Sequence, residues 1–455
     1  MVLKGFCDVR LDEERSKAVQ PEEKAEWMGE KKLHISRCMM DREVETRSDL
    51  LSRQHAKHPT TDGLGQILKI SIDGMDQAKF KVPRNLKSSS AWDKLWRPTL
   101  HVVGAIVYGY YETYCIMDSD QRKDSNMNMT IICILLNLLW DDFKDTPHHL
   151  PRNLAIGFDN TTRESKNQWF ALFLAFLRTA QKFDGTGSQN LTTGHSHNRQ
   201  DQRFSSAATL LSGAPVLEDP EEFADYIRTH LKPADGHKLK VFVLDQTLDF
   251  QSYFASFGIK ISGLAATHTE PDTNHSWSFV SRETCRKMYG TDLEIQCMNP
   301  EWEKLEEHDQ DTILLCKQFL HSSESSQAPL LMMPYSLVVD KTVPEMPLNP
   351  RNKLPMRSLH EFQKTAKAVG AAPWELVKAQ AYLEEWIANN IKSDLPASTL
   401  DLGFFKHYRT FPPTFGLNGI QHAGIQFPAP IQLCVVCGDA SPGGRPYGCP
   451  GFLAP

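Results

Sequence analysis

The chain has 455 residues, and its 40% hydrophobic and 23% charged content is ordinary for a folded protein of two or three domains. A net charge of −6 excludes a polycation that coats nucleic acid along its whole length. The charge is uneven, because residues 65–215 hold 17 Lys and Arg against 14 Asp and Glu, whereas residues 216–325 hold 10 against 20. We therefore expect any anionic partner to bind the first of these segments.

The sequence contains no recognisable targeting segment. Its start lacks the apolar run of a signal peptide, and the longest apolar runs, 101–111 and 131–140, are far shorter than the about 20 residues of a membrane span. Ten cysteines, mostly single and in apolar surroundings, indicate reduced thiols. We expect no membrane association and a nuclear or cytoplasmic location.

The N-terminal residues are charged and helix-prone, and residues 13–31 and 41–57 could form surface helices. The first strand is expected at 67–73, where apolar and polar residues alternate. Residues 77–82 could be its hairpin partner, stopped by Pro83.

The middle of the chain predicts a mixed sheet with helices on its faces. The expected elements are two strands within 100–117 with a bend near Gly109, a helix over 130–143 capped by Ser125, a strand over 154–158, a helix from 169 to about 183, a turn at 184–187, a short strand at 190–193 and a helix from about Asp201.

The C-terminal half predicts a second layer and a helical segment. Its expected elements are a helix over 221–231, strands over 240–244 and 277–280, an acidic helical stretch over 297–320, a linker over 327–355 and a helical pair within 359–391 broken around Pro373.

Acidic residues follow several of these elements. Asp73 and Asp76 lie at or just past the end of the first strand, Asp159 ends a later strand, and Asp201 opens a helix. Carboxylates at two strand ends and a helix start can meet at one edge of a sheet, where they would repel each other unless cations bind between them. Mg²⁺ favours such oxygen ligands, and two such ions can clamp a phosphodiester during in-line displacement. Helix capping is the plain structural alternative for Asp159 and Asp201.

Five stretches carry a resemblance to a known family: IDGMDQAKFKVPR, LWRPTLHVVGAIVYG, MDSDQRKDSN, DNTTRESKN and GHSHNRQDQRF. Together they resemble an uncharacterised domain-of-unknown-function family of transposon-derived proteins, widespread in eukaryotes. The resemblance covers about 65–214 and continues weakly to about 382. The order of its acidic blocks is similar to that of the RNase H-like fold of DDE transposases and integrases.

This resemblance implies an α/β fold and a carboxylate site for Mg²⁺ or Mn²⁺. Asp76 (or Asp73), Asp159 and Asp201 would take the three metal-binding positions, and all four residues are candidate catalytic residues. Strand alternation places Asp73 on the face opposite Ile70 and Ile72, which favours Asp76 slightly if the turn redirects it.

The implied partner is nucleic acid, DNA more than RNA, and homo-oligomers are possible. Trp92 and Trp96 could stack on bases or pack in the core. The candidate nucleic-acid contacts are Arg84, Lys87, Arg97, Arg163, Lys166, Asn167, His195, His197, Arg199 and Arg203.

Two further groups have open interpretations. The charged loop with Asp118, Asp120, Lys123 and Asp124 either reaches a metal or phosphate or solvates a turn. The tail CVVCGDASPGGRPYGC either forms a zinc site or is a disordered tail. The candidate zinc ligands are His422, Cys434, Cys437 and Cys449.

The sequence thus predicts a transposase-derived, RNase H-like protein with metal-dependent phosphodiester hydrolysis or strand transfer. The alternative is a catalytically inactive, domesticated protein that binds nucleic acid or other proteins. The expected domains are a charged, partly ordered helical arm (1–61), an RNase H-like mixed sheet flanked by helices (62–215), an acidic α/β extension (216–325), a Pro/Met-rich linker (326–355), a helical segment (356–410) and a Pro/Gly-rich tail (411–455).

Overall fold

The structure is a computed structural model of the whole chain. It describes residues 21–75, 80–84, 97–118, 120–158, 166–191, 199–234, 236–255, 275–290, 292–322, 328–338, 348–349, 356–370, 376–391, 404–405 and 408.

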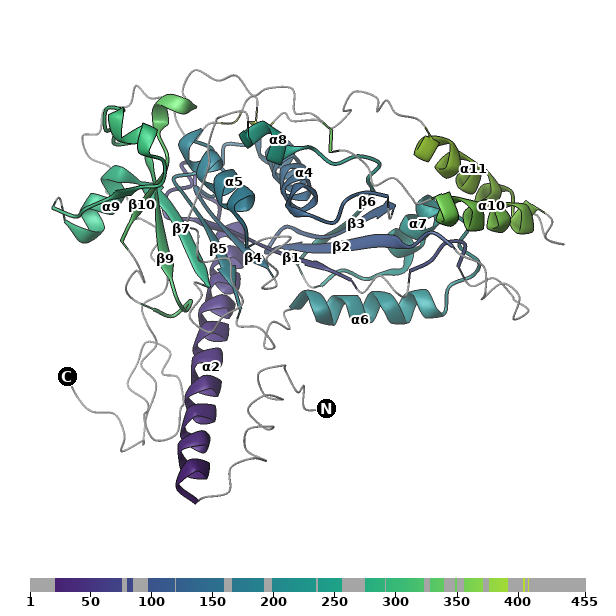
Figure 1. Cartoon of the computed structure of the whole chain (residues 1–455), viewed down its shortest axis with the longest axis horizontal. Coiled ribbons are helices and arrows are strands. Elements are labelled where there is room, and N and C mark those ends of the chain that lie inside the picture. The colour runs from purple at the N-terminus through teal and green to yellow at the C-terminus, as the bar shows by residue number, and fades with distance from the viewer. Residues whose placement is uncertain are drawn as a thin grey trace.

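Within these residues, ten strands form one mixed sheet in the order β6-β3-β2-β1-β4-β5-β7-β9-β10-β8 (Figure 1). The strands are β1 (Ile67–Gly74), β2 (Leu100–Val107), β3 (Tyr111–Asp118), β4 (Asn153–Phe158), β5 (Gly185–Asn190), β6 (Lys238–Val243), β7 (Ser276–Ser281), β8 (Gln296–Cys297), β9 (Thr312–Lys317) and β10 (Leu330–Met333). Strands β1, β2 and β3 are antiparallel neighbours, whereas β4 runs parallel to both β1 and β5. Strands from both sides of residue 215 therefore join one sheet.

Helices cover both faces of this sheet. Figure 1 shows α4, α5 and α8 on one face and α6 on the other. The helices are α2 (Pro21–Lys57), α4 (Ser125–Phe143), α5 (Gln168–Thr179), α6 (Arg199–Ser212), α7 (Pro220–His230), α8 (Phe250–Ala255), α9 (Arg282–Tyr289), α10 (Met356–Gly370) and α11 (Val377–Ile391), with the 3-10 helices η3 (Pro300–Lys304) and η4 (Tyr335–Leu337). None of the helices in the described ranges is long and apolar enough to cross a membrane.

The two faces differ in chemistry. Leu68, Ile70 and Ile72 of β1 belong to the large apolar core that includes α4 and α5. Lys69 and Ser71 alternate with them and therefore point to the opposite face, where both side chains are fully buried. The sheet thus has a buried polar region on its second face.

Several predicted elements are confirmed. The stretch 100–117 forms the hairpin β2–β3, and Gly109 lies in its bend with φ +91°. A side chain there would also collide with Ala56 of α2, so the position requires glycine. Strand β4, the helices at α5, α6 and α7, and the helical pair α10–α11 also lie where the sequence predicts them.

Other predictions are wrong. Residues 77–82 were predicted to pair with β1, but the described part, 80–82, does not, because β2 and β4 occupy the two edges of β1 and Lys81 bridges to Thr99 instead. Asp124 rather than Ser125 caps α4, since its carboxylate accepts the N–H of Asn126 at 3.0 Å. The predicted turn at 184–187 is the start of β5, a strand that is buried at every residue.

Three longer segments also differ from the prediction. A single helix, α2, replaces the two expected surface helices. Its C-terminal half packs on the sheet, where Ser52 Oγ accepts the N–H of Lys69 at 3.0 Å, and its N-terminal half extends away (Figure 1). The acidic stretch 297–320 contains η3 and the buried strand β9 rather than a helix, and the predicted linker 327–355 contains β10. Pairing of β9 with both β7 and β10 overrides the helical composition.

Candidate functional site

Parallel strands β1 and β4 end at the same edge of the sheet. Their register places Ile72 beside Phe158. Asp73 follows Ile72 in β1, and Asp159 follows Phe158 in the sequence but lies outside the described residues. Ile72 and Phe158, which immediately precede the two predicted carboxylates in the sequence, are therefore neighbours in the sheet.

Helix α6 packs against the second face of the sheet beside Asp73. In the β1–β2 register Asp73 pairs with Gly104. A Cβ atom on Gly104 would overlap the side-chain amide of Gln200 and come within 2.5 Å of the Phe204 ring. The absence of a side chain therefore lets the first turn of α6 lie directly on β2. That turn includes the backbone of Asp201, whose side chain lies outside the described residues.

Asp73 is half-buried on this second face, because it alternates with Ile72 in the apolar core. One carboxylate oxygen of Asp73 accepts the N–H of Gly74 at 2.7 Å. A Cβ on Gly74 would lie 3.2 Å from the Lys123 ammonium, so a cation approaches this strand end. Asp73 therefore lies on the face that α6 covers, in a setting that also holds positive charge.

Lys166 and Asn167 precede α5 at the same edge, with different roles. Asn167 caps the helix, since its side-chain oxygen accepts the N–H groups of Trp169 and Phe170, each at 3.1 Å. Lys166 is 1% exposed, and burial lowers its pKa to about 8. Burial also lowers the pKa of His275 to about 4, and the neighbouring Lys166 charge adds to that shift. A buried lysine and a neutral histidine thus lie near each other here.

Three of the predicted phosphate-binding arginines have structural partners. Arg203 Nε lies 2.7 Å from a carboxylate oxygen of the fully buried Glu112. Arg97 donates to the Pro83 carbonyl at 2.7 Å. Arg84 donates to the Leu211 carbonyl at 3.3 Å, which places it roughly 18 Å along α6 from Arg199. Arg84 is therefore distant from the strand ends.

A buried polar layer between α2 and the sheet was missed by the sequence analysis. Lys69 donates to the side-chain oxygen of Gln189, and Glu45 and Asp49 of α2 lie within electrostatic reach of Lys69 and Arg199. Burial raises the pKa of Asp49 to about 7 and raises that of Glu45. The alternation of Lys69 with apolar residues was the available signal for a polar second face.

Two residues of the predicted charged loop, Asp118 and Asp124, make structural contacts. Asp124 caps α4, and Asp118 accepts a hydrogen bond from the Tyr382 hydroxyl of α11.

Among the side chains that the structure describes, no group of three or more His, Cys, Asp and Glu could hold a metal ion. The predictions for Lys87, Trp92, Trp96, Asp76, Asp159, Arg163, His195, His197, His422, Cys434, Cys437 and Cys449 concern residues outside that description.

One region of the chain matches a known protein family. Residues 90–288 match the family described as Domain of unknown function (DUF7869). The DUF7869 match begins before β2 and ends in α9, so it includes positions 159 and 201 but not β1 with Asp73. No curated protein and no solved structure matches the chain.

Proposed function

We propose that this chain is a transposase-derived, RNase H-like protein that uses Mg²⁺ or Mn²⁺ to hydrolyse or transfer nucleic-acid phosphodiesters. The strand order β3-β2-β1-β4-β5 supports the fold assignment, with three antiparallel strands followed by two parallel ones. Helix α4 joins β3 to β4, α5 joins β4 to β5, and α6 follows β5. This is the arrangement expected for an RNase H-like sheet.

The observation that carries the proposal is the pairing of Ile72 with Phe158. It supports a common edge for Asp73 and Asp159, while α6 on Gly104 brings the backbone of Asp201 to the same face. Because that face is the one on which Asp73 lies, Asp73 is favoured over Asp76 as the first ligand.

The three carboxylates provide the oxygen donors that Mg²⁺ prefers. Asp73, Asp159 and Asp201 would hold the ion, which when bound supplies stabilisation of charge that develops on the phosphate oxygens. Lys123, beside Gly74, would attract the nucleic-acid backbone to this edge. DNA is the proposed substrate.

Cleavage of labelled DNA by the full chain tests this function. Activity should require Mg²⁺ or Mn²⁺, and Asp159→Asn should lower it by about a hundredfold or more, as expected for loss of a group that acts in the transition state. Asp141→Asn is the matched control, because Asp141 is an exposed carboxylate paired with Lys144.

The absence of divalent-dependent cleavage in pure protein would contradict the enzymatic proposal. Salt-dependent DNA binding that Asp159→Asn leaves unchanged, without cleavage, would instead select a catalytically inactive nucleic-acid-binding protein.

A further inference from the structure

Exposed apolar side chains are concentrated on one helix. Of the eight large apolar side chains that are exposed in the described ranges, five belong to α2: Met28, Leu33, Ile35, Met39 and Leu50. Four of these five lie in the N-terminal half of α2, which extends away from the sheet (Figure 1). Helix α2 therefore carries apolar surface that the described fold leaves in contact with water.

Most of this apolar surface lies along one line of the helix. Met28, Met39 and Leu50 are spaced by eleven residues, which is close to three helical turns. At 3.6 residues per turn, three further exposed residues fall on the same side, within an arc of about 80°. We call this side the α2 stripe, and its residues are Met28, Lys32, Ile35, Met39, Arg42 and Leu50.

The charges of α2 are divided between its exposed and its buried sides. Between residues 31 and 57, the exposed charged residues are all basic, namely Lys32, Arg37, Arg42 and Lys57. The carboxylates in the same range are buried or half-buried, namely Asp41, Glu43, Glu45 and Asp49. Asp41, for example, accepts the N–H of His321 at 3.2 Å. The exposed side of α2 in this range is therefore positive.

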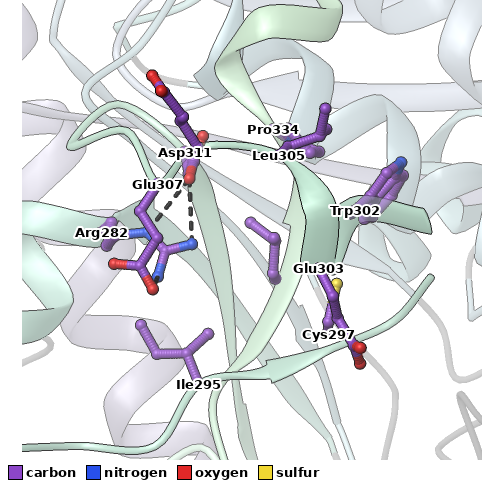
Figure 2. Close-up of a pocket in the computed structure, with 11 residues that line it drawn as sticks. Arg282, Ile295, Cys297, Trp302, Glu303, Leu305, Glu307, Asp311 and Pro334 are labelled. Atoms are coloured by element: carbon purple, nitrogen blue, oxygen red, sulfur yellow. Dashed lines mark hydrogen bonds and ion pairs between the residues drawn. The ribbon is translucent and has the colours of Figure 1, made fainter. Parts of the chain in front are cut away.

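A buried cation elsewhere in the chain shows the opposite case. Arg282 lines a cavity of about 200 Å³ among β8, η3, β9 and β10 (Figure 2). It donates to Asp311 from Nε at 3.2 Å and from Nη2 at 3.1 Å, as the dashed lines show, and its Nη1 lies 3.2 Å from Glu307. Carboxylates of the chain itself thus neutralise Arg282. Lys32 is exposed and forms no ion pair with another described residue, so its charge is available to a partner.

The composition of the α2 stripe decides the class of partner. Ile35 and Met39 lie between Lys32 and Arg42, which are roughly 15 Å apart along the helix. Nucleic-acid phosphates would use the two cations but not the apolar residues. A bilayer would take the apolar residues, but here the cations interrupt the apolar line instead of flanking it. A second copy of α2 would bring like charges together. An acidic helix with an apolar face matches both components.

We propose that the α2 stripe binds an acidic, amphipathic helix of a partner protein. Apolar side chains of that helix pack against Ile35, Met39 and Leu50, and the flexible thioether of Met39 adapts to their shape. Carboxylates of the same helix pair with Lys32 and Arg42. This interaction does not depend on the proposed nuclease function.

A fluorescein-labelled helical peptide of three heptads, built from leucine, glutamate and alanine, tests the proposal. Its leucines form one face, and its glutamates lie beside them. Binding to the full chain is measured by fluorescence anisotropy, next to a peptide with lysine in place of every glutamate. The glutamate peptide should bind at least about tenfold more tightly, because it makes two attractive charge pairs where the lysine peptide makes repulsive ones. Equal binding of the two peptides would overturn the proposal.

Two matched variants locate the contact. Met39 and Leu33 are 56% and 52% exposed, but Leu33 lies about 120° around the helix from Met39, outside the α2 stripe. Met39→Gln should weaken binding of the glutamate peptide about fivefold, because an apolar contact is lost, whereas Leu33→Gln should leave it unchanged. Equal effects of the two substitutions would place the peptide elsewhere and reject the stripe as its site.

A charge exchange tests the role of the cations. Lys32→Glu/Arg42→Glu should reverse the preference, so that the lysine peptide binds more tightly than the glutamate peptide. Circular dichroism melting of each variant separates lost binding from lost folding. A DNA duplex is the competing probe: if the double variant abolishes DNA binding while Met39→Gln changes the binding of neither peptide, the stripe is a nucleic-acid site and the proposal is wrong. Dimerisation in sedimentation that Met39→Gln abolishes would likewise replace the partner helix with a second copy.

Discussion

Asp49 shows how burial changes a single residue of α2. Its side chain is buried against the second face of the sheet and only 4% exposed. This burial raises its pKa to about 7. In the unfolded chain an aspartate has a pKa of about 3.9. Between these two values the folded state keeps a proton that the unfolded state has released, so this group's stabilisation is lost as the pH rises through that window.

We therefore predict that Asp49→Asn reduces the pH dependence of stability. In urea unfolding, the wild-type free energy of unfolding should fall between pH 5 and pH 8 by up to about 3 kcal/mol more than that of the variant. Glu45, whose pKa is also raised by burial, should leave a residual slope of the same sign in the variant. Asp141→Asn, at an exposed site, should keep the wild-type slope. An unchanged slope in Asp49→Asn would contradict the assignment.

For single residues, the sequence predicted the position in the fold better than the contacts that the side chain makes. Asp73 was placed correctly at a strand end and on the face opposite Ile70 and Ile72, but nothing local shows that α6 covers that face. Arg203 was read as a phosphate contact, and its position in a helix beside other basic residues gave no sign of Glu112, 91 residues earlier in the chain. Partners so distant in sequence are determined by packing, which a local pattern does not encode.

Among the elements, α6 depends on one close approach to the sheet. Gly104 leaves the space that the Gln200 amide and the Phe204 ring occupy. Gly104→Ala should therefore displace the first turn of α6 and destabilise the protein by about 1–3 kcal/mol, the usual cost of overpacking.

The measurement is urea unfolding together with DNA cleavage. Because the amide of Gln200 is the nearest obstacle, Gly104→Ala/Gln200→Ala should recover part of the lost stability. Gly213→Ala, where the nearest atom lies 3.8 Å away, is the control. If Gly104→Ala alone is neutral in both assays, α6 does not rest on β2 as described.

Whether a strand could be predicted depended on its amino-acid composition. Strand β4 was predicted because Leu154-Ala155-Ile156-Gly157-Phe158 is an apolar run that ends at a polar turn. Strand β5, Gly185–Asn190, has the composition of a turn, yet hydrogen bonds to β4 and β7 hold it extended. Tertiary pairing overrides weak local preference, so the sequence predicted a turn at 184–187 and a short strand only at 190–193, although the neighbouring strands were found.

Across the whole molecule, the sheet does not follow the boundaries suggested by composition. Strand β6 pairs with β3, and β7 pairs with β5, so chain segments on either side of residue 215 depend on each other. The change from basic to acidic composition near residue 215 therefore does not mark a boundary between two separate cores. The mixed α/β class was predictable from alternating strand and helix patterns, whereas the continuity of ten strands was not.

A buried lysine helps to hold the last described residues, Phe404, Phe405 and Tyr408, against this core. Lys182 is fully buried after α5 and donates to the carbonyls of Phe404 at 3.2 Å, Phe405 at 2.6 Å and Tyr408. Phe404 also donates its N–H to Asn137 of α4 at 2.8 Å. Residues more than 220 positions apart thereby share one core.

Lys182→Met keeps most of the volume but removes the donor, and it leaves three buried carbonyls without this partner. We predict a loss of about 2–4 kcal/mol in the free energy of unfolding and early proteolytic release of a C-terminal fragment that contains Phe404. Lys144→Met, at an exposed lysine, should change neither readout. If aromatic packing of Tyr408 against Trp140 alone holds the segment, Lys182→Met will match the wild type in proteolysis, and the lysine then has no role in docking. A fragment released at the wild-type rate, together with unchanged urea unfolding, would therefore exclude the buried lysine as the link between the C-terminal segment and the sheet.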